Sequence, residues 1–370
     1  FLDDAGLADR IVERLEGAGH QTTLVRPGDT FAKMSDGSYV ISPERGREGY
    51  DLMVQDLVKS GNVPSRVLHL WLTTQDESHR PGSSFFHRNQ ERGFYSLLFL
   101  AQAIADENLP RPLQITVVTS DAQQVAGEGL AHPEKALALG PALVTPRELP
   151  GVHVRTLDVR LPEVQKRLFG GKLAMAFVDP FAGRKTVTAG LDALAESVLE
   201  EALAEPGSSV AALRAGKRFE RTYRRRKLEA IEEDHRPLLR DGGTYLITGG
   251  LGGLGLVAAE EIARSVEKPT LVLVGRSGLP ESSTWDAHIA EHGDTDPTSL
   301  KIARVRELDA LGATVVVEKA DVTNVAQIRE LFAKVRQPHG PIRGVVHTAG
   351  VVRDELLQVK SLSAIEEVFA

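Results

Sequence analysis

Four short apolar runs in the C-terminal third of the chain each end in small or polar residues. They cover Tyr245–Ile247, Thr270–Val274, Ala313–Lys319 and Ile342–His347. A continuous apolar run between turn residues is typical of a strand that is buried on both faces of a parallel sheet. Apolar residues with helical spacing follow the first run, over Leu256–Val266. This alternation predicts an α/β fold with a doubly wound parallel sheet.

The N-terminal part of the chain shows the same alternation. Strands are predicted at Arg66–Leu72, Leu113–Thr119 and Val152–Val159, and helices at Leu7–Leu15 and Gln90–Asp106. We therefore expect two Rossmann-like α/β halves. The second half is expected to be incomplete at its C-terminus, because the chain ends inside a helical pattern.

A glycine-rich segment joins the first strand of the second half to its helix. It comprises Thr248, Gly249, Gly250, Leu251, Gly252, Gly253, Leu254 and Gly255. Glycines let a backbone turn tightly and approach a ligand, while a helix N-terminus offers free N–H groups and a positive dipole end. The spacing fits both GxGxxG and the TGxxxGxG pattern of short-chain reductases. The segment is predicted to hold a pyrophosphate, with a ligand-free glycine turn as the alternative.

The second strand of this half ends in Gly275-Arg276-Ser277-Gly278. In dinucleotide-binding folds an acidic residue at this position binds the ribose hydroxyls, whereas an arginine accommodates a 2′-phosphate. Arg276, with Ser277 beside it, therefore favours NADPH over NADH. An ordinary surface arginine is the alternative interpretation.

The third and fourth strands also end in residues suited to a dinucleotide. Asp321 can reach the adenine amino group, and the backbone of Val322 can meet the edge of the ring. Ala349 and Gly350 are small enough to leave room for the ribose and nicotinamide. Four strand ends would then meet at one edge of a parallel sheet, which is where open α/β sheets bind ligands.

These motifs together resemble a known family. Residues 241–370 look like the cofactor-binding half of the ketoreductase domain of a modular type I polyketide synthase, within the short-chain dehydrogenase/reductase superfamily. The matching segments are TGGLGGLG (248–255), LVLVGRSG (271–278), ADV (320–322) and GVVHTAGVVRDELL (344–357), with further similarity over residues 284–298. Residues 1–240 are similar to the structural subdomain that precedes the catalytic half, including KRFERTY (217–223).

The resemblance implies a reaction and its partners. A complete domain of this family transfers hydride from NADPH to the β-carbonyl of an acyl chain, which an acyl carrier protein holds as a phosphopantetheine thioester. Neighbouring synthase domains are implied as further partners. The catalytic lysine, serine and tyrosine of the family lie downstream of the segment that ends at Leu357, so we expect no catalytic residue in this chain and no activity from it alone.

The first half is interpreted as a degenerate copy of the second. Residues 64–69 echo residues 341–347, and residues 152–159 echo residues 314–322. Where the second half has its glycine segment, the first offers only Asp3-Asp4-Ala5-Gly6-Leu7. Two aspartates there would repel a pyrophosphate. We expect this half to bind no nucleotide and to brace its neighbour.

Several polar residues allow two interpretations. Tyr223 and Lys227 match the YxxxK spacing of short-chain reductases, but they precede the glycine segment, so the match is attributed to chance. The basic run 221–227 could contact an acidic carrier protein, although a solvated strand or linker is favoured.

His347 is expected to shape its loop. Asp354 aligns with the last residue of the Leu-Asp-Asp marker of B-type ketoreductases, which makes it a candidate for stereocontrol; a helix N-cap is the alternative.

Composition narrows the function classes. The 370 residues carry a net charge of −7, which argues against general nucleic-acid binding. We expect no membrane span, because no apolar run of 18 residues occurs, and no signal peptide. The absence of cysteine excludes disulfides and is compatible with a cytoplasmic setting. The 11 histidines show no metal-ligand spacing, and His69 and His153 are expected in the core.

Two other functions stay open at this point. The chain could belong to a non-catalytic pseudo-ketoreductase that braces neighbouring synthase domains, although a scaffold has no need of phosphate-shaped glycines. It could instead be a free-standing short-chain dehydrogenase. The roughly 240 residues before the glycine segment argue against that, because free enzymes usually begin close to it.

Overall fold

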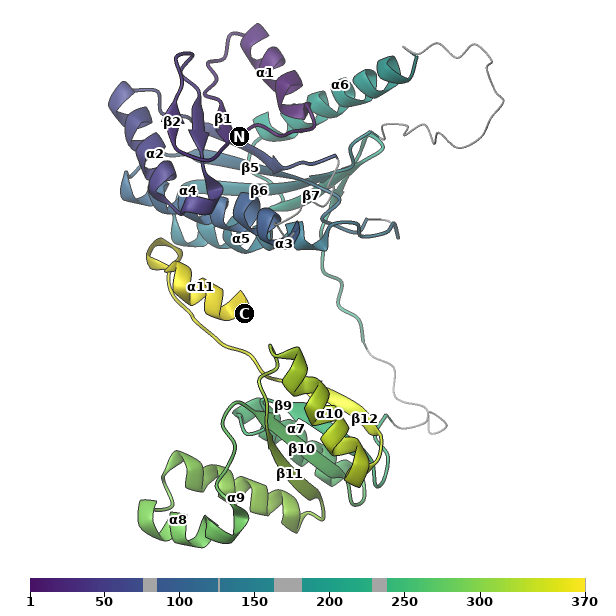
Figure 1. The fold of residues 1–370 in the computed structure, drawn as a ribbon. Coiled ribbons are helices and arrows are strands. Elements are labelled where there is room, and N and C mark those ends of the chain that lie inside the picture. The colour runs from purple at the N-terminus through teal and green to yellow at the C-terminus, as the bar shows by residue number, and fades with distance from the viewer. Residues whose placement is uncertain (76–84, 126, 163–181, 228–237, 370) are drawn as a thin grey trace. The chain divides into compact units, whose positions relative to one another are not determined.

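The computed structural model describes residues 1–75, 85–125, 127–162, 182–227 and 238–369. Two compact units share the chain. Unit 1 comprises Phe1–Arg225 and Glu355–Lys360, and unit 2 comprises Arg226–Asp354 and Ser361–Ala370. The division lies before the boundary expected at 240/241, and six residues near the C-terminus belong to the first unit. Figure 1 shows the elements of each unit.

Unit 2 is built on a sheet of four parallel strands. Their spatial order is β11-β10-β9-β12. The strands are β9 (Thr244–Thr248), β10 (Thr270–Gly275), β11 (Thr314–Lys319) and β12 (Ile342–His347). All four were predicted from their apolar runs. The order places the first strand between the second and the fourth, as in Rossmann folds.

Helices cover both faces of this sheet because successive side chains of each strand point to opposite faces. Ile247 and Leu273 pack with α7 (Gly253–Ser265) and α9 (Pro297–Ala310). Leu246 and Val272 pack instead with α10 (Val325–His339). This explains the continuous apolar runs and confirms the doubly wound α/β fold.

Residues 281–299 are rich in polar residues and glycine, yet they are largely helical. They contain a short 3-10 helix, η4 (Ser282–Thr284), then α8 (Trp285–His292) and the start of α9. The carboxylate of Asp296 caps α9 by accepting hydrogen bonds from the N–H groups of Thr298 and Ser299. The C-terminal helical pattern forms α11 (Leu362–Phe369).

Unit 1 contains a five-stranded sheet with the order β4-β5-β6-β7-β8, in which only β8 is antiparallel. The strands are β4 (Arg66–Leu72), β5 (Leu113–Ser120), β6 (Val152–Val159), β7 (Val210–Arg214) and β8 (Lys217–Glu220). A small second sheet has the order β1-β3-β2, formed by β1 (Val25–Pro27), β2 (Ala32–Lys33) and β3 (Tyr39–Ile41).

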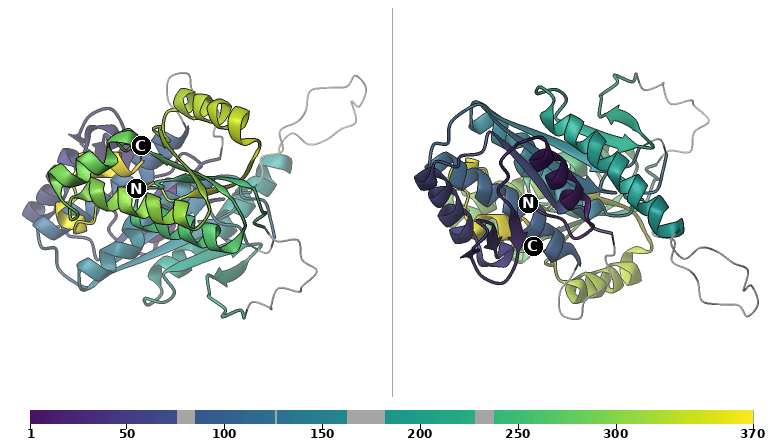
Figure 2. Two further views of the ribbon diagram at one scale, coloured as in Figure 1. Left: turned by 90° about the horizontal axis from the view of Figure 1, so that it is seen from below. Right: turned by 90° about the horizontal axis from the view of Figure 1, so that it is seen from above.

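The helices of unit 1 also lie on both faces of its main sheet. The core of one face joins α1 (Leu7–Gly17) and α6 (Ala182–Leu203) to the sheet, and Figure 2 shows these two helices together from above. The opposite face carries α4 (Ser96–Asp106) and α5 (Leu139–Glu148) (Figure 1). Unit 1 also contains η1 (Pro43–Arg45), α2 (Glu48–Ser60), α3 (Phe85–Asn89), the π-helix η2 (Gln90–Tyr95), η3 (Pro133–Ala138) and η5 (Leu357–Val359).

The sheet order supports one internal echo and contradicts the other. Backbone hydrogen bonds place Phe1 beside β4, as β9 lies beside β12 in unit 2. The resemblance of residues 64–69 to 341–347 therefore has a structural counterpart. The proposed match of residues 152–159 to 314–322 is wrong. In unit 1, β4 lies between Phe1 and β6. In unit 2, β9 lies between β12 and β11, so β11 is on the other side of the first strand from the position that β6 would require.

The N-terminus of α1 is satisfied by a carboxylate of its own chain. Both oxygens of Asp3 accept hydrogen bonds, from the N–H groups of Ala5 at 2.8 Å, Leu7 at 3.1 Å and Ala8 at 2.6 Å. In a nucleotide-binding half, a phosphate would accept such bonds. The negative charge that was expected to repel a pyrophosphate thus occupies the place where an anion would bind.

We predict that Asp3→Ala lowers the free energy of unfolding by about 1–2 kcal/mol, because three N–H groups lose their acceptor. Asp4→Ala is the matched control, since the Asp4 carboxylate pairs with Arg92 at the surface, a contact worth about 0–1 kcal/mol. Urea denaturation of both variants measures the difference. Equal losses would show that the Asp3 hydrogen bonds do not stabilise α1.

A buried histidine lies on β4 in the core of unit 1. Nε2 of His69 forms a hydrogen bond of 2.7 Å with the hydroxyl of Ser96. The ring of His69 stacks on that of Phe1 at 4.7 Å, and burial holds the pKa of His69 well below 6.5. His69 is a core histidine as expected, whereas His153 is exposed and the expectation for it was wrong.

Stability should therefore depend on pH through His69. As the pH falls below the ordinary histidine pKa of about 6.5, the unfolded chain binds a proton at His69 that the folded chain does not, so the free energy of unfolding falls. We expect this histidine to account for a loss of about 1–2 kcal/mol from pH 8 to pH 5, measured by urea denaturation. His69→Gln does not titrate in this range and should reduce the loss; an unchanged pH dependence in that variant would contradict the assignment.

Candidate functional site

The glycine segment follows β9 and adopts a backbone that side chains would obstruct. Gly249 has φ +67°, and a Cβ there would lie 2.9 Å from the backbone of Thr348 and Ala349. At Gly250 a Cβ would lie 2.7 Å from the Cα of Leu273. The segment is therefore packed directly against the neighbouring strands β12 and β10.

Gly255 and Gly253 have different surroundings. A Cβ on Gly255 would meet the carbonyl oxygen of Gly249 at 2.3 Å, so the turn requires glycine there. A Cβ on Gly253 would meet nothing within 4 Å. The turn itself thus accounts for Gly255, whereas Gly253 stands in open space that a ligand could use.

The N-terminus of α7 differs from that of α1. Its N-cap is Gly252, which has no side chain to accept hydrogen bonds from the first turn. Leu251 is buried, while Leu254 is 76% exposed. The first N–H groups of α7 are thus available to an external acceptor, and an anion such as a pyrophosphate suits such a position.

Thr248 links the ends of β9 and β12. Its hydroxyl forms a hydrogen bond of 2.7 Å with Nδ1 of His347 and accepts one of 3.3 Å from the N–H of Ala349. The carbonyl of Thr248 accepts from both the N–H and the hydroxyl of Thr348. His347 and Thr348 therefore hold the shape of the loop that contains Ala349 and Gly350.

Arg276, Ser277, Asp321 and Val322 follow β10 and β11 at the same edge of the sheet. Arg276 and Ser277 are exposed. Arg276 forms no hydrogen bond or ion pair with the part of the chain that the structure describes, so its guanidinium is available. Its positive charge lies near enough to Asp321 to contribute to lowering the pKa of that carboxylate.

The Asp321 carboxylate is already held in a turn. One of its oxygens accepts hydrogen bonds from the N–H and the hydroxyl of Thr323, each 2.9 Å long. These bonds, with a smaller contribution from Arg276, lower the pKa of Asp321. The N–H of Asp321 donates to the side chain of Gln327 at 2.8 Å. Gln327 gives no signal in the sequence, because an exposed glutamine on a helix carries no distinctive pattern.

Ala349 is half-buried and Gly350 is exposed, with open space where a Cβ would be. Asp354 is exposed as well. The helix N-cap interpretation of Asp354 is wrong: residues 351–356 are irregular, and the 3-10 helix η5 (Leu357–Val359) has Leu356 as its N-cap. The geometry leaves the stereocontrol role of Asp354 as a prediction.

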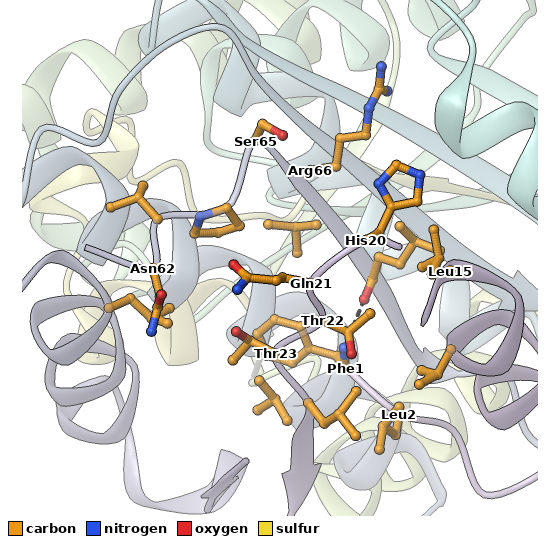
Figure 3. A pocket seen from close by; sticks show the side chains of 18 of the residues that line it. Phe1, Leu2, Leu15, His20, Gln21, Thr22, Thr23, Asn62, Ser65 and Arg66 are labelled. Atoms are coloured by element: carbon orange, nitrogen blue, oxygen red, sulfur yellow. Dashed lines mark hydrogen bonds between the residues drawn. The ribbon is translucent and has the colours of Figure 1, made fainter. Parts of the chain in front are cut away.

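A large cavity lies in unit 1 and is separate from these residues. It has a volume of about 710 Å³ and is lined mainly by aliphatic side chains, with polar groups such as Gln21, Thr22, Asn62 and Ser65 (Figure 3). None of the predicted site residues lines it. Within the described ranges, no cluster of three or more potential metal ligands occurs, and no helix is long and apolar enough to cross a membrane.

The fold and the glycine turn define unit 2 as a Rossmann-like domain with a glycine loop at the start of its first helix. Residues 243–370 match the family model described as KR domain. Residues 1–167 match the model described as beta-ketoacyl synthase-like, N-terminal. The C-terminal part of the chain is thus similar to KR domains.

Curated relatives are polyketide synthases of much greater length. 6-Methylsalicylic acid synthase of Penicillium patulum is 40% identical over 153 residues, which cover 40% of this chain and 8% of the relative. Polyketide synthase PksN of Bacillus subtilis is 36% identical over 131 residues, covering 35% of this chain and 2% of the relative. The chain therefore corresponds to a small part of these proteins.

Solved structures extend the likeness in fold to the whole chain. An N-terminal ketoreductase from the macrolactin assembly line has a TM-score of 0.67 and 21% identity, covering 99% of this chain and 63% of that one. A keto acid-selecting NRPS module with adenylation, ketoreductase and pseudo Asub domains has a TM-score of 0.70 and 23% identity, covering 100% of this chain and 27% of that one. Both units thus have the fold of ketoreductase regions.

The glycine geometry predicts opposite effects for two neighbouring substitutions. Gly255→Ala should lower the free energy of unfolding by about 1–3 kcal/mol, because the Cβ would collide with the Gly249 carbonyl. Gly253→Ala is the matched control and should be neutral or stabilising by up to about 1 kcal/mol. Urea denaturation compares them. A stable Gly255→Ala variant would show that the turn can relax.

Proposed function

We propose that this chain is the cofactor-binding part of a ketoreductase in a type I polyketide synthase, which reduces a β-ketoacyl thioester to the β-hydroxyacyl form. Its similarity to KR domains and its site geometry support the same activity. The single observation that carries the proposal is the glycine turn before α7, where the helix N-terminus lacks a side-chain cap and Gly253 leaves open space.

The cofactor is assigned as NADPH. The glycine segment of residues 248–255 would hold the pyrophosphate with the first N–H groups of α7. Arg276 and Ser277 would hold the 2′-phosphate, which an exposed guanidinium without an ion pair to the described residues suits well. The charge of Arg276 is therefore the main reason to favour NADPH over NADH.

The remaining strand ends would hold the rest of the cofactor. Asp321 has a second carboxylate oxygen outside its turn bonds to Thr323, and this oxygen would accept from the adenine amino group. Val322 would pass along the ring edge. Ala349 and Gly350 would lie at the nicotinamide ribose, in the loop that Thr248 fixes. The bound cofactor would supply hydride to the β-carbonyl, while these residues hold and orient it.

We assign different roles to the two parts of the chain. We assign residues 1–240 to the structural subdomain and residues 241–370 to the NADPH-binding part of the catalytic subdomain. The Asp3 carboxylate occupies the N-terminus of α1, which supports a bracing role without nucleotide for the first. The acyl chain would arrive on an acyl carrier protein, and neighbouring synthase domains would complete the assembly.

Fluorescence titration of the chain with NADPH and NADH tests this proposal. Arg276→Ala should weaken NADPH binding by about ten- to a hundredfold, the contribution of hydrogen bonds to a charged group, and leave NADH binding nearly unchanged. Gly253→Asp should weaken both, because it places a negative charge at the pyrophosphate position.

Arg343→Ala provides the matched control. Arg343 is also an exposed arginine of unit 2, but it lies at the beginning of β12, the opposite end of that strand from Thr348. Its removal should leave both affinities unchanged. Equal NADPH affinity for the unmodified chain and Arg276→Ala would contradict the 2′-phosphate assignment. No binding by a folded unmodified chain would favour the scaffold function instead.

A further inference from the structure

An exposed lysine of unit 2, Lys319, lies beside the turn that follows β10. It is the last residue of β11, which is the neighbour of β10 in the sheet (Figure 1). The register of the two strands places Lys319 opposite Gly275, where β10 ends and the turn of residues 276–278 begins. Lys319 and Arg276 therefore lie at the same edge of the sheet, although they come from different strands.

The aliphatic stem of Lys319 packs on this turn. A Cβ placed on Gly278 would lie 3.1 Å from Cγ of Lys319, 3.4 Å from Cδ and 4.0 Å from Cε. The stem thus runs along the turn, while the residue as a whole is exposed. This arrangement is typical of a lysine whose methylene groups lie on the protein surface and whose ammonium stays in water. The packing therefore keeps the ammonium close to the turn.

The ammonium of Lys319 has no partner among the residues that the structure describes, with which it forms neither a hydrogen bond nor an ion pair. The preceding residue, Glu318, lies on the opposite face of the strand. Its carboxylate pairs there with Lys334 at 2.7 Å. The charge of Glu318 is therefore already matched by another lysine, and the charge of Lys319 is available to a ligand.

Two available cations at one short turn favour the binding of an anion. Arg276 opens the turn and Lys319 packs on its third residue, Gly278. Charges of the same sign repel each other, and an anion beside both converts that repulsion into attraction. A phosphate monoester carries about 1.5 to 2 negative charges near pH 7, which is more than one guanidinium neutralises. Such a phosphate matches the summed charge of the arginine and the lysine.

We propose that Lys319 is a second cation for the 2′-phosphate of NADPH, beside Arg276. The arginine binds phosphate oxygens through its planar guanidinium, whereas the lysine acts as a point charge. This inference rests on the proposed function, since that function assigns the turn after β10 to the adenosine end of the cofactor. It adds a residue of β11 to the selection of NADPH over NADH, because NADH has a hydroxyl in place of this phosphate.

Titration of the chain with NADPH, NADH and 2′,5′-ADP tests the inference. Lys319→Met keeps the aliphatic stem on the turn and removes only the charge. It should weaken the binding of NADPH and of 2′,5′-ADP by about three- to tenfold, the effect of one exposed charge contact to a phosphate, and leave NADH affinity unchanged. Lys319→Arg keeps the charge and should restore most of the lost affinity.

Lys268→Met is the matched control. Lys268 is also an exposed lysine of unit 2, but it precedes β10, at the opposite end of that strand from Arg276. Its replacement should leave all three affinities unchanged. In the double variant Arg276→Ala/Lys319→Met, NADPH should bind no more tightly than NADH, because both cations for the phosphate are then absent.

The outcomes separate this inference from the proposed function. If Arg276→Ala weakens NADPH binding and Lys319→Met does not, the role of Lys319 is overturned and the proposed function stands. Equal losses of NADPH and NADH affinity in Lys319→Met would overturn the role as well, because the lysine would then act on a part that both cofactors share. If the folded unmodified chain binds none of the three nucleotides, both proposals fail.

Discussion

The close approach of the β9 and β12 strand ends is the constraint on which the site depends. Gly249 lies so near the backbone of Thr348 and Ala349 that no Cβ fits. Thr248 then joins the two strand ends through its hydroxyl and carbonyl. Because the strands are parallel and adjacent, this contact places the glycine turn and the Ala349–Gly350 loop at the same edge of the sheet. The cofactor assignment depends on that juxtaposition.

The two units use the same physical feature, a helix N-terminus after a strand, in opposite ways. In unit 1 the Asp3 carboxylate accepts three N–H groups at the start of α1. In unit 2 the N-cap of α7 is Gly252, and the space at Gly253 is open. An internal carboxylate stabilises α1, whereas the N-cap of α7 supplies no side-chain acceptor. Under the proposed function, this difference distinguishes a half that braces from a half that binds a phosphate.

The sequence by itself determined the strands of unit 2, its α/β class and the glycine turn, because doubly buried strands leave continuous apolar runs and tight turns leave glycines. It did not determine the helices of residues 281–299, whose apolar faces are too weak to register, or the irregular backbone after Asp354. Only the tertiary structure decided that Asp3 caps α1 and that, within unit 1, Gln102 and Glu148 form hydrogen bonds with the backbone of Leu357, and Gln102 also with that of Lys360. These contacts join residues as many as 258 positions apart, and no local pattern encodes which distant backbone groups a buried side chain will meet.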